Sequence, residues 1–182
     1  MGQANSSPTL GSKTVAALRE LLPLLLRFLS NEYDDTSMAV FPFLTDLLSQ
    51  VRIPTVSIVY RLNSQSRRSA KKTGTDVVDR DFLQALLQAL FKKMRYDDDS
   101  ISSENEDSEE EAEFHDLRKR LLGFQESVAA TDPELYSRAV QNLVSAALRS
   151  LNSGTSNWRD MEVALVEMNA FADCLKGTFA NR

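Results

Sequence analysis

The spacing of apolar residues constrains this chain more than any other feature. In six segments they recur every three or four positions, which places them on one face of an α-helix. The only short stretch of β-branched character, 56–60, would form an isolated strand with nothing to pair with. The sequence therefore predicts an all-α protein. The predicted helices cover approximately 13–30, 40–51, 76–95, 114–131, 132–151 and 158–172.

Several helix boundaries carry local signals. Asp132, Pro133 and Glu134 give an N-cap acid, a proline at the first helical position and an acid in the first turn, which together predict a helix start. Pro23 lies inside the first apolar run, where it removes a backbone hydrogen bond, so we expect a kink or a split there. Residues 31–35 form a polar break before the second helix.

Pairing consecutive helices gives about three antiparallel hairpins, which predicts a HEAT-like α-solenoid. A single six-helix bundle fits the same periodicities and stays open as an alternative. The expected division is a flexible N-terminus at 1–12, hairpins at 13–51, 76–131 and 132–176, a basic linker or insertion at 52–75, an acidic loop at 97–113 and a flexible C-terminus at 177–182.

The charge distribution is uneven. Residues 97–113 hold ten of the 26 acidic residues. The whole chain has a formal net charge of −5, but the rest of the chain, with 21 basic and 16 acidic residues, is net positive. Such a basic remainder is typical of a surface that follows a phosphate backbone, although lysines at a helix C-terminus also suit its dipole. The candidate nucleic-acid-binding residues at helix ends are Lys92, Lys93, Arg95, Arg118, Lys119 and Arg120. Further basic residues of the insertion are Arg61, Arg67, Arg68, Lys71 and Lys72.

The acidic run predicts a solvated loop that screens the basic surface or contacts a basic partner. Ser103 and Ser108 each have a glutamate three positions later, so both are candidates for acid-directed phosphorylation.

Composition argues against an enzyme. The chain has one histidine and one cysteine and lacks phosphate-binding, dinucleotide-binding and zinc-protease motifs, so we expect no catalytic site, cofactor, metal or small-molecule substrate. We interpret His115 as a surface residue, Cys174 as a buried thiol and Trp158 as a packing residue without a second aromatic partner. The longest apolar stretch, 21–29, is far shorter than the ~20 residues of a membrane span.

Several separated segments resemble exportin-T, the tRNA exportin family, and its fungal members in particular. Those segments are Leu29-Ser30-Asn31-Glu32-Tyr33-Asp34-Asp35-Thr36-Ser37, Val40-Phe41-Pro42-Phe43-Leu44, Lys93-Met94-Arg95-Tyr96-Asp97, Glu111-Ala112-Glu113-Phe114, Leu117-Arg118-Lys119-Arg120-Leu121 and Asn157-Trp158-Arg159-Asp160. They occur between about residues 21 and 171, and none of them is a catalytic signature.

The resemblance implies an internal fragment of an importin-β-type HEAT solenoid. Such a receptor binds tRNA together with Ran-GTP, meets nuclear pore proteins and shuttles between nucleus and cytoplasm. Its cargo and Ran-GTP favour the same curvature, so each raises the affinity for the other. The alternative is a helical scaffold that binds only protein partners through apolar grooves between hairpins.

Overall fold

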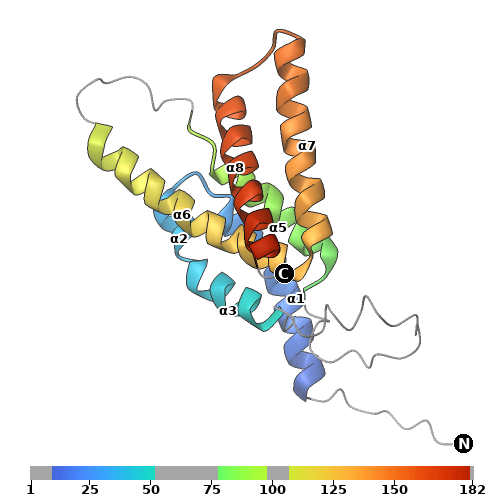
Figure 1. Ribbon diagram of the computed structural model, residues 1–182. Coiled ribbons are helices and arrows are strands. Elements are labelled where there is room, and N and C mark those ends of the chain that lie inside the picture. Colours follow the sequence, from blue (N-terminus) through green and yellow to red (C-terminus); the bar gives the residue numbers. More distant parts are fainter. Residues whose placement is uncertain (1–9, 52–77, 98–106, 181–182) are drawn as a thin grey trace, which may run out of the picture.

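The computed structural model describes residues 10–51, 78–97 and 107–180. These ranges contain seven α-helices and no strand, which confirms the prediction of an all-α protein. Figure 1 shows the helices in chain order, and none of them is long and apolar enough to cross a membrane. Their bounds are α1 Leu10–Leu29, α2 Asp34–Met38, α3 Phe41–Val51, α5 Arg80–Lys93, α6 Asp107–Thr131, α7 Pro133–Asn152 and α8 Trp158–Ala180.

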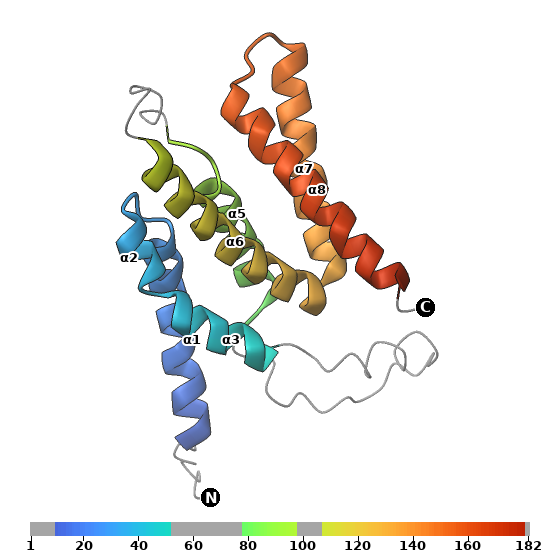
Figure 2. The ribbon, with the colours of Figure 1, turned by 60° about the vertical axis from the view of Figure 1, so that its left-hand side comes forward.

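The helices form three consecutive pairs in two layers. We call α1 with α3 the first pair, α5 with α6 the middle pair, and α7 with α8 the last pair. One layer forms because α1 packs against α5 and α5 packs against α7. In the other layer α3 packs against α6, and α6 bonds to α8 through side chains. Figure 2 shows the first and last pairs at opposite ends, with the middle pair between them. This order is that of an open, HEAT-like array, not of a closed bundle.

The core consists of the apolar stripes that these layers bury. At the first joint, between the first and middle pairs, the rings of Phe41 and Phe124 meet edge to face with centroids 5.0 Å apart. The apolar side chains with the least exposure are Leu29, Leu44, Leu48, Leu86, Leu87, Leu90, Met94, Leu121 and Val128. Because they come from every long helix except those of the last pair, the middle pair is the centre of the core.

Side-chain caps fix two of the helix starts. The Asp132 carboxylate accepts a hydrogen bond from the backbone N–H of Leu135 at 3.0 Å, and Pro133 is the first residue of α7. This confirms the predicted start, because the cap satisfies an N–H group that has no partner inside the helix. The Asp79 carboxylate caps α5 in the same way, by accepting from the N–H of Phe82 at 2.8 Å.

The first hairpin differs from the prediction in two respects. Helix α1 continues through Pro23 without a split, and Leu22 and Leu25, on its inward face before and after the proline, both belong to the core that α1 and α5 share. The polar break contains the short helix α2, in which the Ser37 hydroxyl donates to the carbonyl oxygen of Asp34 at 2.8 Å. A helix of five residues is too short to show an apolar period, so periodicity could not predict it.

Some predicted loops and ends are wrong in the residues that the structure describes. Helix α6 begins at Asp107, so 107–113 of the predicted acidic loop are helical. Acidic residues suit a helix N-terminus, whose free N–H groups carry partial positive charge. Helix α1 already includes residues 10–12 and α8 continues to Ala180, so both ends are more helical than expected. The basic insertion at 52–75 and Ser103 lie outside the described residues.

Candidate functional site

Three segments that are distant in the sequence meet where α5 ends and α8 begins. They are 93–97, 114–120 and 157–160, and they overlap four of the segments that carry the family resemblance. Their meeting place is part of the second joint, between the middle and last pairs. Five of the six candidate nucleic-acid-binding residues lie on these segments, and the sixth, Lys92, directly precedes the first segment, so the geometry decides which of them can reach a ligand.

Arg118 is the centre of the second joint. Its side chain is only 7% exposed, and its Nε donates to the carbonyl oxygen of Met94 at 2.9 Å. Its two terminal nitrogens each donate to one carboxylate oxygen of Glu162 at 2.6 Å. The guanidinium also lies over the rings of Tyr96 and Phe114, 4.5 and 4.6 Å from their centroids. These contacts occupy the guanidinium, so Arg118 is a structural link between α6 and α8 and is not available to a phosphate group.

Two further arginines hold the segment after α5 against the start of α8. The Nε of Arg95 bonds to the Asp160 carboxylate at 2.6 Å, and the Nε of Arg159 donates to the carbonyl oxygen of Asp97 at 3.1 Å. Both arginines are partly buried. The chain therefore leaves α5 along the N-terminal turn of α8.

Trp158 is a packing residue, but it has the aromatic partner that the sequence did not indicate. Its ring lies 5.8 Å from that of Tyr96, and the Arg159 guanidinium lies 4.9 Å above it. About half of the indole stays exposed.

Lys93 has a structural role at the first joint. Its Nζ donates to the carbonyl oxygens of Asn31 and Glu32 at 2.7 and 3.1 Å and lies 2.6 Å from the Asp34 carboxylate. The side chain is 11% exposed. It caps the end of α1 with a positive charge, as suits the negative end of a helix dipole.

The other three candidate residues remain exposed: Lys92 on α5, and Lys119 and Arg120 on α6. Lys119 bonds to the Asp116 carboxylate at 2.8 Å, which holds the pKa of that carboxyl below its usual value. The Arg120 guanidinium lies 5.5 Å from the centroid of the Phe41 ring. Both α6 residues bear charge on a solvated face, so they can meet a ligand from solution.

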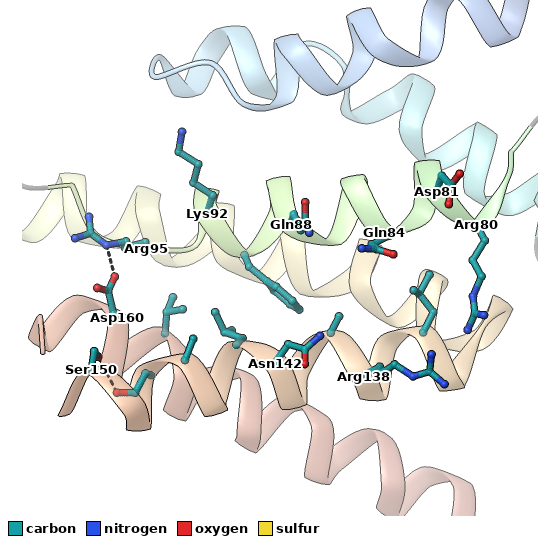
Figure 3. Close-up of a pocket in the computed structure, with 17 residues that line it drawn as sticks. Arg80, Asp81, Gln84, Gln88, Lys92, Arg95, Arg138, Asn142, Ser150 and Asp160 are labelled. Carbon is teal, nitrogen blue, oxygen red and sulfur yellow. Dashed lines mark hydrogen bonds and ion pairs between the residues drawn. The ribbon is translucent and has the colours of Figure 1, made fainter. Parts of the chain in front are cut away.

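A pocket of about 880 Å³ lies between α5 and α7. Its apolar lining includes Phe91 and Leu143, and amide side chains from both helices border it (Figure 3). Arg80 and Arg138 lie at one end and Lys92 and Arg95 at the other. The cations at the first end are bound by acids, since Arg80 lies 2.9 Å from Asp132 and Arg138 pairs with Glu134. The pocket is therefore an apolar groove whose border is nearly neutral.

A buried polar pair joins α6 and α8 below Arg118. Glu167 is 0% exposed, and its Oε1 accepts from the Gln125 side-chain amide at 2.9 Å. The other carboxylate oxygen and the amide oxygen of Gln125 have no hydrogen-bond partner among the residues that the structure describes. Burial raises the pKa of Glu167 to about 7, although Gln125 and Arg118 act in the opposite direction. A protonated Glu167 could donate to the Gln125 oxygen, which would satisfy both atoms.

The remaining titratable candidates behave as ordinary residues of their surroundings. His115 is exposed, with its Nε2 3.7 Å from the Glu111 carboxylate one turn earlier. Cys174 packs against the core, and burial raises the pKa of its thiol, so the reactive thiolate is disfavoured. Within the described residues no group of three or more potential metal ligands lies together. The arrangement offers binding surfaces and structural links.

The sequence did contain a signal for the buried polar groups. Phe114, Arg118, Leu121, Gln125 and Val128 recur at spacings of four and three, so Arg118 and Gln125 occupy positions on the inward stripe of α6. A polar residue in such a stripe indicates a buried partner. Reading the basic triplet Arg118 to Arg120 as one surface patch missed this, since consecutive residues face different sides of a helix.

Comparisons with known proteins identify the family. The sequence model of the Exportin-T family matches residues 9–181. Exportin-T of Pyricularia oryzae is 37% identical over 159 residues, which cover 86% of this chain and 14% of that protein. Exportin-T of Aspergillus terreus is 37% identical over 173 residues, which cover 93% and 16% of the two chains.

A more divergent relative covers still more of the chain. Exportin-T of Scheffersomyces stipitis is 31% identical over 176 residues, or 97% of this chain and 15% of that protein. The chain thus spans about one-seventh of the length of the curated relatives that it matches. Because the family model covers nearly all of it, this chain belongs to the Exportin-T family.

Proposed function

We propose that this chain is a segment of a nuclear export receptor that binds tRNA cooperatively with Ran-GTP and carries it from the nucleus to the cytoplasm. The observation that carries the proposal is the family match over residues 9–181, together with an open array of helix pairs. Such a receptor acts by binding alone and meets nuclear pore proteins as it shuttles between the two compartments. A fluorescent fusion of the full-length receptor should enter the nucleus and return, and permanent exclusion from the nucleus would contradict this.

An array of helix pairs suits this role because each pair contacts only its neighbours. Small rotations at successive joints add up to a change of curvature. If tRNA and Ran-GTP favour the same curvature, each raises the affinity for the other by the same factor. The second joint would contribute a stiff link to such an array, because a bidentate ion pair and a buried amide contact both cross it.

Among the six candidate residues, we propose that the exposed Lys92, Lys119 and Arg120 contact phosphate groups. Arg118, Lys93 and Arg95 are engaged in structural bonds instead. The test is tRNA binding by the full-length receptor, measured by anisotropy with Ran loaded with a non-hydrolysable GTP analogue. Replacing the three exposed residues by glutamine should weaken binding and lower the salt slope by about one for each phosphate group that is no longer bound.

The matched control is Arg149→Gln, which removes an exposed positive charge from α7. It should leave the salt slope unchanged. An unchanged salt slope in the triple variant would contradict the phosphate contacts. If the unmodified receptor shows no Ran-dependent tRNA binding, the proposed function itself is contradicted.

The groove between α5 and α7 favours a second candidate function, a scaffold that binds only proteins. Its apolar lining and amide border suit a peptide better than a phosphate backbone. If the full-length receptor binds no RNA with or without Ran-GTP, this second function is the one to pursue.

A further inference from the structure

Arg120 is an exposed residue of α6 that reaches across the first joint to α2 and α3. Its Nη1 donates to the Sδ of Met38, the last residue of α2, at 3.5 Å. Its guanidinium lies 5.5 Å from the ring centroid of Phe41, the first residue of α3, which is within the range of a cation–π interaction. The surroundings of this cation therefore depend on where α2 and α3 lie against α6.

Phe41 meets two successive turns of α6. Besides its contact with Arg120, its ring packs edge to face against the ring of Phe124, which lies four positions later on α6. Phe41 is only 4% exposed, so a buried ring supports an exposed cation. Phe41 itself is hidden from a macromolecule in solution, but it can determine how Arg120 is presented to one.

The guanidinium of Arg120 keeps most of its capacity to donate hydrogen bonds. Arginine has five N–H donors, and in Arg120 only Nη1 has an acceptor among the described residues, the sulfur of Met38. Arg118 differs, because its Nε and both terminal nitrogens are bound to Met94 and Glu162. A cation–π contact leaves in-plane N–H groups that can bind a phosphate group through two parallel hydrogen bonds. Arg120 is therefore held in place and still able to bind an anion.

Lys119 provides the comparison, since it is the adjacent residue, is also exposed and carries the same charge. Its Nζ bonds to the Asp116 carboxylate, three positions earlier on the same helix. In the part of the chain that the structure describes, it bonds to no residue of α2 or α3. A movement at the first joint would change the surroundings of Arg120 and leave those of Lys119 as they are.

We propose that Arg120 couples phosphate binding to the closure of the first joint, because Phe41 holds its guanidinium in the orientation that receives a phosphate group of bound RNA. This inference rests on the proposed function and names the residue through which tRNA favours one curvature of the array. Since RNA binds better when α3 lies against α6, bound RNA stabilises that arrangement by the same factor. A phosphate contact of Lys119 has no such effect.

The test is the tRNA affinity of the full-length receptor, measured by anisotropy with Ran loaded with a non-hydrolysable GTP analogue. Arg120→Gln and Lys119→Gln should each lower the salt slope by about one. Phe41→Leu should weaken binding roughly two- to fivefold, although the residue is buried, because it removes the ring that orients Arg120. This loss should persist in the Lys119→Gln background and disappear in the Arg120→Gln background, as expected of two residues that act as one unit.

Leu48→Val is the control for Phe41→Leu, since it also shortens a buried apolar side chain of α3, about two turns from Phe41. It should leave the tRNA affinity unchanged. Circular dichroism checks that each variant is folded, and Phe41→Met replaces Phe41→Leu if the latter loses its helices.

Two results would overturn this inference alone. In one, the unmodified receptor shows Ran-dependent tRNA binding and the Phe41 variant binds tRNA equally well. In the other, the Phe41 variant loses the same affinity whether or not Arg120 is present. If the unmodified receptor binds no tRNA with Ran, the proposed function is overturned and this inference with it.

Discussion

The two joints of this molecule hold their helix pairs by different means. The first joint is largely apolar, with the leucines of α1 against α5 and Phe41 of α3 against Phe124. The second joint adds buried polar groups, with Arg118 bound to Glu162 and Gln125 bound to Glu167. Apolar contacts supply cohesion that tolerates changes of similar volume, whereas a buried ion pair fails when one partner is removed. The comparison teaches that the first joint mainly supplies apolar stabilisation, whereas the second joint also fixes the position of α8 relative to α6.

The largest expected effect is at the second joint. Arg118→Ala would leave the carbonyl oxygen of Met94 without its donors and Glu162 without its partner. We expect the free energy of unfolding to fall by about 4 kcal/mol, measured by urea denaturation. Arg118→Lys should recover little, because an ammonium group cannot bond both carboxylate oxygens and the carbonyl in the same plane. Lys119→Ala is the matched control, and a similar loss there would contradict the assignment of the joint to Arg118.

At the first joint, the effect of a substitution on the free energy of unfolding should depend on the volume of the side chain and not on its chemical type. Phe41 is buried, so Phe41→Ala removes the edge-to-face contact and leaves a cavity, at a cost of about 3 kcal/mol. Phe41→Leu should cost about half as much, since an apolar side chain of nearly the same size fills the space. Equal losses of unfolding free energy from both substitutions, in the same urea experiment, would show that the first joint also depends on the exact side chain and not only on its volume.

Glu167 should make the second joint sensitive to pH. Its pKa in the folded chain is about 7, above the ordinary value of 4.5 that it regains on unfolding. The folded state therefore binds the proton more tightly, so this contribution is complete below pH 4.5 and is lost as the pH rises through 7. We expect the unmodified chain to lose roughly 2 kcal/mol between about pH 5 and about pH 8 relative to Glu167→Gln.

That comparison cancels the other titrating groups, including Tyr136 near the pair. Glu167→Gln keeps the shape and can bond the Gln125 amide without a proton. Urea curves for both proteins at several pH values provide the measurement. Parallel pH profiles for the two proteins would mean that Glu167 is ionised in the folded chain.

The smallest expected effect belongs to the polar contact of the first joint. Lys93→Met removes the ammonium that bonds two carbonyl oxygens near the end of α1 but keeps most of the apolar stem. A loss of about 1 kcal/mol is expected, because partly exposed polar contacts contribute little net stability. Lys92→Met, on the exposed face one residue earlier, should change the melting temperature far less. If the Lys93 variant is as damaging as Arg118→Ala, the distinction between the joints does not hold.

The sequence predicted the helices better than the roles of their polar residues. Asp132 and Pro133 marked the start of α7 correctly because capping depends on neighbouring residues alone. The extension of α6 back to Asp107 was missed, because the composition of an acidic run favours a loop while its position before an apolar helix favours continuation.

The basic candidates show where sequence reasoning stops. Arg118 and Lys119 are neighbours of the same charge, yet one is buried and the other is exposed. The inward stripe of α6 distinguishes them, but nothing in the sequence indicates that Glu162, 44 positions later, is the partner of Arg118. Such pairings depend on how helices from different pairs are placed, which periodicity within one helix does not describe.

The connection between α6 and α7 has a mechanical consequence. One residue, Asp132, separates the end of α6 at Thr131 from the start of α7 at Pro133, and its carboxylate and the proline ring each fix a backbone torsion nearby. So short a linkage leaves α6 and α7 little freedom to rotate relative to each other. A displacement of the last pair is therefore transmitted to the middle pair, and the two pairs rotate together as one rigid body. Bending of this part of the array would then be concentrated at the junction of α1 and α3 with the middle pair.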